Sequence, residues 1–372
     1  KTRVLTQRLN HLLACGVEPE RITALAYNRR AALEMRARLP AAGACIKTLH
    51  ALGYALLRKQ KSVRLASDHE QRMLLKKLVK PPALLNQDPL QPYLEAMQRI
   101  RLGLMDPEEV EEQNFQELPG LAQAFPLYRE QLAERGWLDY DEQIYGALEL
   151  LLQEPELRKQ AQRACTHLLV DEFQDLTPAF LLMVRLLSAP AQQVFGVGDD
   201  DQVIYGYAGA TPEYLVDFDK YFPGSSQHKL QVNYRCPPGI VQAAGHMLLY
   251  NRKRVPKDTR ALESRSGGPP QLLLGNQPGQ LALDQVQAWV DQAGPASVAV
   301  LARVNSLLMP IQVLLSVRGI PHSGAVDSSV LQRTGVRSAL AYLHLAMDRF
   351  SPADLADALR RPSRKLKREV LE

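Results

Sequence analysis

The chain has 372 residues, of which 46% are hydrophobic, and its 45 basic and 40 acidic side chains give a net charge of +5. This composition predicts two or three globular domains, and the mild positive charge is compatible with a nucleic-acid partner without proving one. It excludes a disulfide scaffold, because Cys15, Cys45, Cys165 and Cys236 are scattered, and a membrane span or signal peptide, so we expect a cytoplasmic protein without membrane contact.

The chain begins with Lys1-Thr2-Arg3, and apolar residues at helical spacing follow. Phosphate-binding loops end in Lys followed by Ser or Thr at the point where a helix begins. The pair therefore fits the last residues of such a loop, although an arbitrary N-terminus would give the same two residues. The glycines whose N–H groups cradle phosphate are absent, so we expect this sequence to be part of a longer protein.

A strand–helix unit and then a second strand are expected next. A strand is predicted at 22–27 and a helix at 28–39, with Asn28 as the N-cap of the helix. The helix carries several arginines, which is typical of a solvated charged face. Thr48 and His50 then follow an apolar stretch, and a single histidine after a strand is more often structural than a ligand.

A helical pattern broken by prolines extends from residue 68 to residue 160, with no strand pattern inside it. We expect a helical subdomain that is inserted between two strands of a sheet. Near its end lies the acidic stretch 137–142. The acids are compatible with a helix N-terminus, which favours negative charge.

The stretch that organises the chain is His167–Asp175. Its apolar run, 168–170, predicts a buried parallel strand that ends in Asp171 and Glu172. An open α/β sheet holds its ligands at the C-terminal ends of its strands, and one carboxylate there can hold Mg²⁺ while its neighbour orients a water. An acidic turn after a core strand is the alternative interpretation.

A second apolar strand, 194–197, is followed by three aspartates and Gln202. An amide at this place can sense a phosphate or the attacking water, and Tyr205 and Tyr207 can offer a flat face to a base. The basic run 360–368 fits a solvated face, with DNA contact as the alternative. Further elements are expected as a helix at 212–222, a strand at 228–232, a strand at 298–303 and a helix at 309–318.

Several blocks of the chain resemble the UvrD/Rep family of superfamily 1 DNA helicases, in order and in spacing. They lie at 27–38, 46–52, 171–175, 197–205 and 230–236. The resemblance implies an α/β fold, with a RecA-like parallel sheet as a P-loop NTPase core, a helical insertion, and part of a second RecA-like domain. The implied domains are the first part of 1A (1–67), the helical insertion 1B (68–160), the rest of 1A (161–226), the first part of 2A (227–335) and the start of helical 2B (336–372).

The resemblance also implies ATP and Mg²⁺ as cofactors. Lys1 would contact the β- and γ-phosphates, and Thr2 and Asp171 would hold Mg²⁺. Glu172 would orient or deprotonate the attacking water, and Gln202 would link the γ-phosphate to the DNA track. The implied ATP-binding residues are Lys1, Thr2, Arg3, Asp171, Gln202, Tyr234 and Arg235.

Tyr234 and Arg235, otherwise ordinary surface residues, would stack on adenine and act as an arginine finger. Five positions depart from the family pattern. Arg29 stands where many relatives have Asn, Leu49 and Ala51 stand where Phe and Ser are usual, and Tyr207 and Ala208 stand where Trp and Arg are usual. The implied DNA-binding residues are Tyr27, Arg29, Arg30, Thr48, His50, Tyr205 and Tyr207.

The implied activity is ATP-driven 3′-to-5′ movement along single-stranded DNA, with unwinding at single-strand/double-strand junctions, in repair, recombination or replication. Two alternatives stay open. One is a translocase subunit of a nuclease or repair complex. The other is a DNA-binding remnant with weak or no ATP hydrolysis, since the phosphate-loop glycines and the family's late motifs are missing. The sequence does not identify the protein partners.

Overall fold

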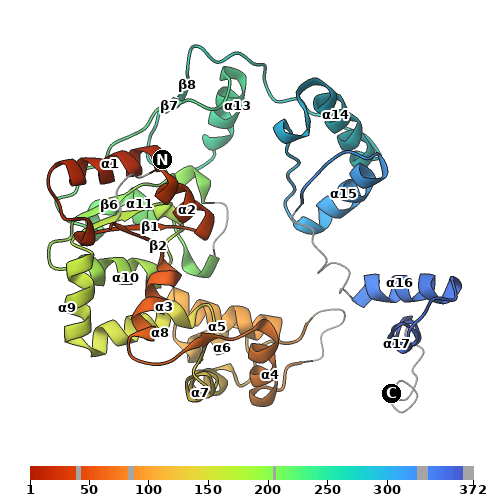
Figure 1. Cartoon of the computed structure of the whole chain (residues 1–372), viewed down its shortest axis with the longest axis horizontal. Helices are drawn as coiled ribbons and strands as arrows, with labels where there is room; N and C mark the ends of the chain where they lie inside the picture. Colours follow the sequence, from red (N-terminus) through yellow and green to blue (C-terminus); the bar gives the residue numbers. More distant parts are fainter. Residues whose placement is uncertain (39–42, 83–87, 204–206, 325–333, 363–372) are drawn as a thin grey trace. The chain divides into compact units, whose positions relative to one another are not determined.

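The structure is a computed structural model that describes residues 1–38, 43–82, 88–203, 207–324 and 334–362. It divides into two compact units, Lys1–Pro269 and Pro270–Glu372 (Figure 1). The first unit contains all the residues of the predicted nucleotide and DNA sites.

A parallel four-stranded sheet lies at the centre of the first unit (Figure 1). Its strand order is β2-β1-β5-β6, and each neighbouring pair is parallel, which confirms the predicted α/β fold. The predicted buried strand at 168–170 is confirmed as β5, which is buried from its second residue onward. The strands of this sheet are β1 Ile22–Ala26, β2 Cys45–Thr48, β5 His167–Val170 and β6 Val194–Gly196.

Helices cover both faces of the sheet (Figure 1). Leu9 of α1 and Met35 of α2 pack with Leu169 on one face. Leu168 and Val170 point to the opposite face and pack with α3, α8 and α10, because successive strand residues alternate between faces. The helices around the sheet are α1 Thr2–Ala14, α2 Arg29–Ala37, α3 Leu49–Arg58, α8 Glu142–Gln153, α9 Pro155–Ala164 and α10 Pro178–Ser188.

Two of these helices begin directly after strands, and local caps fix where they begin. Asn28 Oδ1 accepts a hydrogen bond from the N–H of Ala31 at 2.8 Å, which confirms the predicted N-cap of α2. Thr48 Oγ1 accepts from the N–H of Ala51 at 3.1 Å at the start of α3. Each such cap typically contributes about 1 kcal/mol, so the strand ends and the helix starts are fixed together.

A second hydrophobic core lies in the helical insertion, around the buried rings of Tyr93 and Tyr128. The prediction that no strand interrupts this region was wrong, because β4 pairs with β3 in parallel. The Arg64 guanidinium lies 4.5 Å from the centre of the Trp137 ring across this pair. Two residues are too few to show strand alternation in a sequence. The elements here are β3 Arg64–Leu65, α4 Asp68–Leu78, α5 Gln91–Gly103, α6 Pro107–Gln113, α7 Leu121–Glu134 and β4 Trp137–Leu138.

The chain after the sheet is less regular than predicted. The helix expected at 212–222 is divided into α11 and α12, because Asp217 has non-helical backbone angles (φ −101°, ψ 37°). Only Val232 of the strand expected at 228–232 lies in a strand, since the preceding residues are exposed and the pair of β7 with β8 is short. The elements are α11 Glu213–Val216, α12 Phe218–Tyr221, β7 Val232–Asn233, α13 Pro238–Leu248 and β8 Arg260–Ala261.

The second unit packs α14 against α15 through Leu283 and Leu315. The helix predicted at 309–318 is confirmed as α15 to within one residue. The strand predicted at 298–303 was wrong: these residues form no strand, and Leu301 is 91% exposed, because no strand of the described second unit lies beside them. The helices are α14 Pro278–Ala293, α15 Leu308–Val317, α16 Thr334–Ala346 and α17 Pro352–Arg360.

Among the helices in the described ranges, none has the length and apolar character needed to cross a membrane.

Candidate active site at the edge of the sheet

The paired carboxylates lie where β5 ends. The backbone N–H of Asp171 donates to the carbonyl of Leu25 in β1 at 2.9 Å, and the side chain is buried. Burial, and then the charge of Glu172, raises the pKa of Asp171 above its usual range. Its Oδ1 has no hydrogen-bond partner among the residues that the structure describes. A buried carboxylate oxygen without a partner is a group that Mg²⁺ would satisfy, so these residues fit the predicted metal.

Glu172 adopts a left-handed backbone conformation (φ 48°, ψ 51°), which costs a non-glycine residue about 1 kcal/mol or more. Its carboxylate forms an ion pair with the ammonium of Lys1. Lys1 Nζ also donates to Gln202 Oε1 at 3.1 Å. The structure thus brings together three predicted site residues, from the start of the chain and from the loops after β5 and β6.

A buried amide that the sequence analysis did not single out, Gln174, joins these two loops. Its Nε2 donates to Glu172 Oε2 at 2.8 Å, and its Oε1 accepts from the backbone N–H of Asp199 at 2.8 Å. Gly198 permits this contact, because a Cβ there would lie 2.7 Å from Gln174 Oε1. The only sequence signal for Gln174 was its position inside the carboxylate block.

Asp199 completes a closed set of contacts, since its Oδ2 accepts from Gln202 Nε2 at 2.8 Å. The set, which we call the polar ring, consists of Lys1, Glu172, Gln174, Asp199 and Gln202. Each glutamine amide has one donor and one acceptor end. Both amides are therefore oriented, with the nitrogen toward a carboxylate and the oxygen toward an N–H group.

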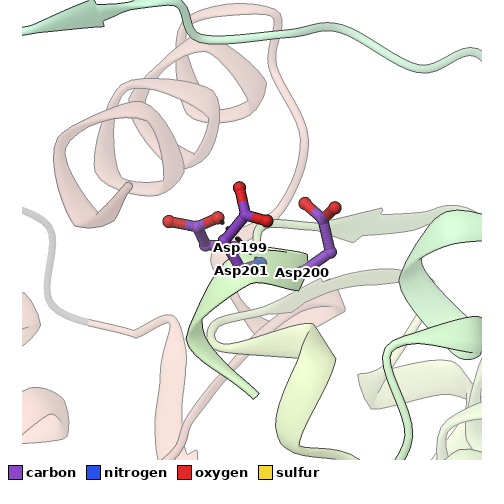
Figure 2. Close-up of side chains that lie close together, drawn as sticks. All are labelled: Asp199, Asp200 and Asp201. Carbon is purple, nitrogen blue, oxygen red and sulfur yellow. Dashed lines mark hydrogen bonds between the residues drawn. The ribbon is translucent and has the colours of Figure 1, made fainter. Parts of the chain in front are cut away.

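Three carboxylates, those of Asp199, Asp200 and Asp201, gather after β6 (Figure 2). Their oxygens lie within 4.8 Å of one another, a spacing that can hold a metal ion. The ammonium of Lys257 occupies this position, at 2.7 Å from Asp199, 2.5 Å from Asp200 and 2.9 Å from Asp201. A cation of the chain itself balances this acid triplet, so we assign no metal to it.

The start of α1 has the character of an anion site. No side chain caps this helix in the described structure, and its first turn contains no acidic residue. The first N–H groups and the positive end of the helix dipole therefore favour a negatively charged ligand. Lys1 is the N-cap and Thr2 the first helical residue, and the side chain of Arg3 is exposed.

Tyr234 and Arg235 follow β7 in a turn that Asn233 holds. Asn233 Oδ1 accepts from the N–H groups of Arg235 and Cys236, both at 2.9 Å. Tyr234 is 66% exposed, and Arg235 is exposed as well. Within the described ranges, neither side chain forms a hydrogen bond or an ion pair with the polar ring, so the structure does not bring these two predicted residues to it.

An aromatic surface contains part of the predicted DNA site. The ring of His50 stacks on that of Tyr140, with centroids 3.8 Å apart and an interplanar angle of 24°. Burial lowers the pKa of His50 to about 4, so this ring is neutral at pH 7. Tyr140 and Tyr27 are both more than half exposed. The sequence analysis did not identify Tyr140 as a candidate DNA-binding residue, because it interpreted only the acidic residues on either side of it.

The acids beside Tyr140 are structural. The buried guanidinium of Arg101 lies 2.7 Å from Asp139 and 3.2 Å from Asp141. Asp139 Oδ1 also accepts from the N–H of Glu142 at 2.8 Å, at the first residue of α8. This contact confirms the helix N-terminus interpretation of the acidic stretch, and the ion pairs fix the backbone on both sides of Tyr140.

The structure gives less specific support to the other residues of the predicted DNA site. Arg29 and Arg30 are exposed, and Arg30 pairs at 3.3 Å with an acid one turn along its own helix. The hydroxyl of Thr48 caps α3. Tyr205 lies outside the described residues, and so does the side chain of Tyr207.

Two family models match the chain: one described as the UvrD/REP helicase N-terminal domain matches residues 1–223, and one described as the UvrD-like helicase C-terminal domain matches residues 228–372. The putative ATP-dependent DNA helicase YjcD of Bacillus subtilis (strain 168) is 28% identical over 94% of this chain and 48% of its own length. DNA helicase II of Escherichia coli (strain K12) is 29% identical over 98% of this chain and 53% of its own length. The ATP-dependent DNA helicase Rep of the same strain is 30% identical, with 93% and 54% covered. The chain spans about half the length of these curated relatives.

Proposed function

Since the chain belongs to the UvrD/Rep helicase family, we propose that it forms the ATP-hydrolysing motor of a DNA helicase. In this proposal the motor moves 3′-to-5′ along single-stranded DNA and unwinds duplex at single-strand/double-strand junctions. The observation that carries the proposal is the contact of Lys1 with both Glu172 and Gln202. It joins a residue suited to phosphate with a carboxylate suited to activate water and with an amide suited to sense the phosphate.

Glu172 has the role of orienting the attacking water and accepting its proton. Gln174 donates to this carboxylate and so holds it in one orientation. Lys1 would leave Glu172 for the phosphates when ATP binds, which frees the carboxylate for the water. Gln202 would then lose its contact with Lys1, and this change is how the amide would report the γ-phosphate.

Asp171 and Thr2 would hold Mg²⁺, which supplies positive charge to the phosphate oxygens when it is bound. The buried Asp171 Oδ1, without a partner in the described part of the chain, supports this assignment. Arg3, in the first turn of α1, adds positive charge to the start of this helix.

Tyr234 and Arg235 have the proposed roles of stacking on adenine and of stabilising charge on the γ-phosphate. Both are exposed and lie outside the polar ring. Hydrolysis would therefore require the segment that carries them to close on the nucleotide, as conformational steps do in many nucleotide-dependent enzymes.

The proposed DNA track combines base stacking with phosphate contacts. Stacking on aromatic side chains contributes about 1–3 kcal/mol per base and does not depend on base identity. The exposed rings of Tyr27 and Tyr140 support such a track. The proposed track residues are Tyr27, Arg29, Arg30, Thr48, His50, Tyr140, Tyr205 and Tyr207.

A translocase that hydrolyses ATP but unwinds little, as a subunit of a nuclease or repair complex, is the second candidate. Ala208 favours it, because this residue stands where the family usually has an arginine. Its side chain is buried and carries no charge that could bind a DNA phosphate. Weaker binding of DNA would reduce unwinding more than it would reduce movement along a free single strand.

ATP hydrolysis by the full-length gene product, with and without single-stranded DNA, tests the proposal. We expect turnover that rises with single-stranded DNA, and unwinding of a duplex with a 3′ tail but not of one with a 5′ tail. DNA-stimulated turnover without unwinding would select the translocase. The absence of ATP turnover would contradict both candidates.

A further inference from the structure

The segment that follows α13 lies against the acid triplet. In addition to the three contacts of Lys257, Arg254 Nη2 donates to Asp201 at 2.7 Å, and the N–H of Val255 donates to Asp200 at 2.7 Å. The side chain of Lys257 is 13% exposed and that of Asp200 is 3% exposed. The cluster is therefore a largely buried set of paired charges and not a surface ion pair that water and salt would weaken.

Asp199 belongs both to this cluster and to the polar ring. Its Oδ1 accepts from Lys257 at 2.7 Å, and its Oδ2 accepts from Gln202 at 2.8 Å. Because each oxygen has its own donor, the carboxylate cannot rotate without losing a contact. The orientation of the Gln202 amide therefore depends on where the ammonium of Lys257 lies.

Both groups keep their charge at neutral pH. Burial works against the charge of Lys257, but its hydrogen bonds to the three carboxylates outweigh burial and raise its pKa above the usual range. Burial also works against the charge of Asp199, and there the contacts with Lys257 lower the pKa below its usual range. The link between them is a lasting electrostatic contact in the neutral range.

We propose that Lys257 is a positioning residue for ATP hydrolysis, which orients the Gln202 amide through the carboxylate of Asp199. The inference rests on the proposed function of the same site. Lys257 and Arg235 lie on the stretch of chain that begins at β7, so a displacement of this stretch would change the orientation of Gln202 as well. The phosphate-sensing amide would thereby respond to the position of the segment that carries Arg235.

The test compares Lys257→Met, Lys257→Arg and Arg254→Met in the full-length gene product. Arg254→Met is the matched control, because it removes one cation from the same cluster without touching Asp199. We expect Lys257→Met to lower kcat for DNA-stimulated ATP hydrolysis about tenfold, since small misplacements of catalytic groups are costly, with KM for ATP changed less than about twofold. Arg254→Met should stay within about twofold of the wild type, and Lys257→Arg should restore most of the loss.

Three results would overturn the inference: an unchanged kcat in Lys257→Met, an equal loss in Arg254→Met, or a loss that resides in KM. Lys257→Met leaves the acid triplet short of positive charge and can unfold the protein. The double variant Lys257→Met with Asp200→Asn keeps the charge balance and leaves Asp199 intact. The same expectations and the same contradicting results apply to it.

A readout without turnover separates this inference from the proposed function. The side-chain NH₂ signals of Gln202 in a ¹⁵N spectrum, assigned with Gln202→Glu, should shift in Lys257→Met and stay in place in Arg254→Met. Unmoved signals in both variants would overturn the link. A wild-type protein without ATP turnover would refute the proposed function, while these signals would still decide whether Lys257 orients Gln202.

Discussion

The polar ring and the Tyr234–Arg235 turn would act on the same nucleotide, but they differ in how firmly contacts within the protein hold their side chains. Four members of the ring lie in the loops that follow the parallel strands β5 and β6, Lys1 lies at the start of α1, and each member contacts two others. The turn is exposed, and it is held by the hydrogen bonds of two backbone N–H groups to Asn233 Oδ1 and by one from Arg265 Nε to the carbonyl of Tyr234 at 3.0 Å. The comparison teaches that the fold preassembles the half that is proposed to activate water, whereas the proposed role of the other half would require ligand binding or movement.

Arg235→Ala should give the largest effect on the exposed half. If Arg235 acts as an arginine finger, turnover should fall about 10³-fold in the DNA-stimulated ATPase assay. The melting temperature should not change, because the side chain is exposed and has no ion pair in the described structure. Arg252→Ala, at another exposed arginine of the same stretch, is the control. A loss below about tenfold would remove Arg235 from this role.

In the preassembled half, Gln174→Leu should lower both ATP turnover and stability, whereas Arg235→Ala should lower turnover alone. Turnover should fall about 10²-fold, because Glu172 loses the donor that orients it. The free energy of unfolding should also fall by about 1–3 kcal/mol, because buried polar groups lose their partner. Urea unfolding and the ATPase assay measure the two effects, with the exposed Gln113→Leu as the control. Loss of activity at full stability would mean that the ring is not part of the folded framework.

Tyr140→Ala should weaken single-stranded DNA binding about tenfold, since one stacked base contributes about 1–3 kcal/mol. ATP hydrolysis without DNA should keep its KM, because Tyr140 lies outside the polar ring. Fluorescence anisotropy with a labelled oligonucleotide measures the affinity. Tyr140→Phe should bind normally, and so should Tyr250→Ala, which removes a ring that is 88% exposed. Equal affinity of Tyr140→Ala and the wild type would exclude Tyr140 from the track.

The smallest effect concerns pH. Burial lowers the pKa of His50 to about 4 in the folded protein, while the unfolded chain keeps the ordinary value of about 6.5. Between these values the unfolded state binds more protons, so stability falls as the pH falls and is unaffected by His50 well above pH 6.5. We expect less than about 1 kcal/mol between pH 7 and pH 6. Urea unfolding should show this loss of stability at pH 6 in the wild type and not in His50→Gln. The same loss in both proteins would mean that groups other than His50 cause it.

The sequence predicted those parts of the fold that depend on residues close together in the chain. Buried strands show as continuous apolar runs, and Asn28 caps α2 through an N–H three residues away. The pairing of β4 with β3 and the break at Asp217 depend on neighbours distant in the chain. The apolar run at 298–303 satisfied the same pattern as β5, but no strand of the described second unit lies beside it.

The candidate site was predictable to a similar degree. Asp171 and Glu172 could be found because they directly follow an apolar strand, and Gln202 because it follows the three aspartates after the next apolar strand. Gln174 and Lys257 could not, since their importance lies in contacts to residues 25 and 58 positions away, which no local pattern encodes.

The most direct test of the account is ATP turnover by Glu172→Gln at saturating single-stranded DNA, measured beside ATP binding. The account predicts that turnover falls about 10³-fold, because the group that accepts the proton of water is lost, while ATP binding stays within about threefold of the wild type. Glu130→Gln, at an exposed acid far along the chain, should behave as the wild type. Turnover that survives in Glu172→Gln would mean that the polar ring is not the site of hydrolysis.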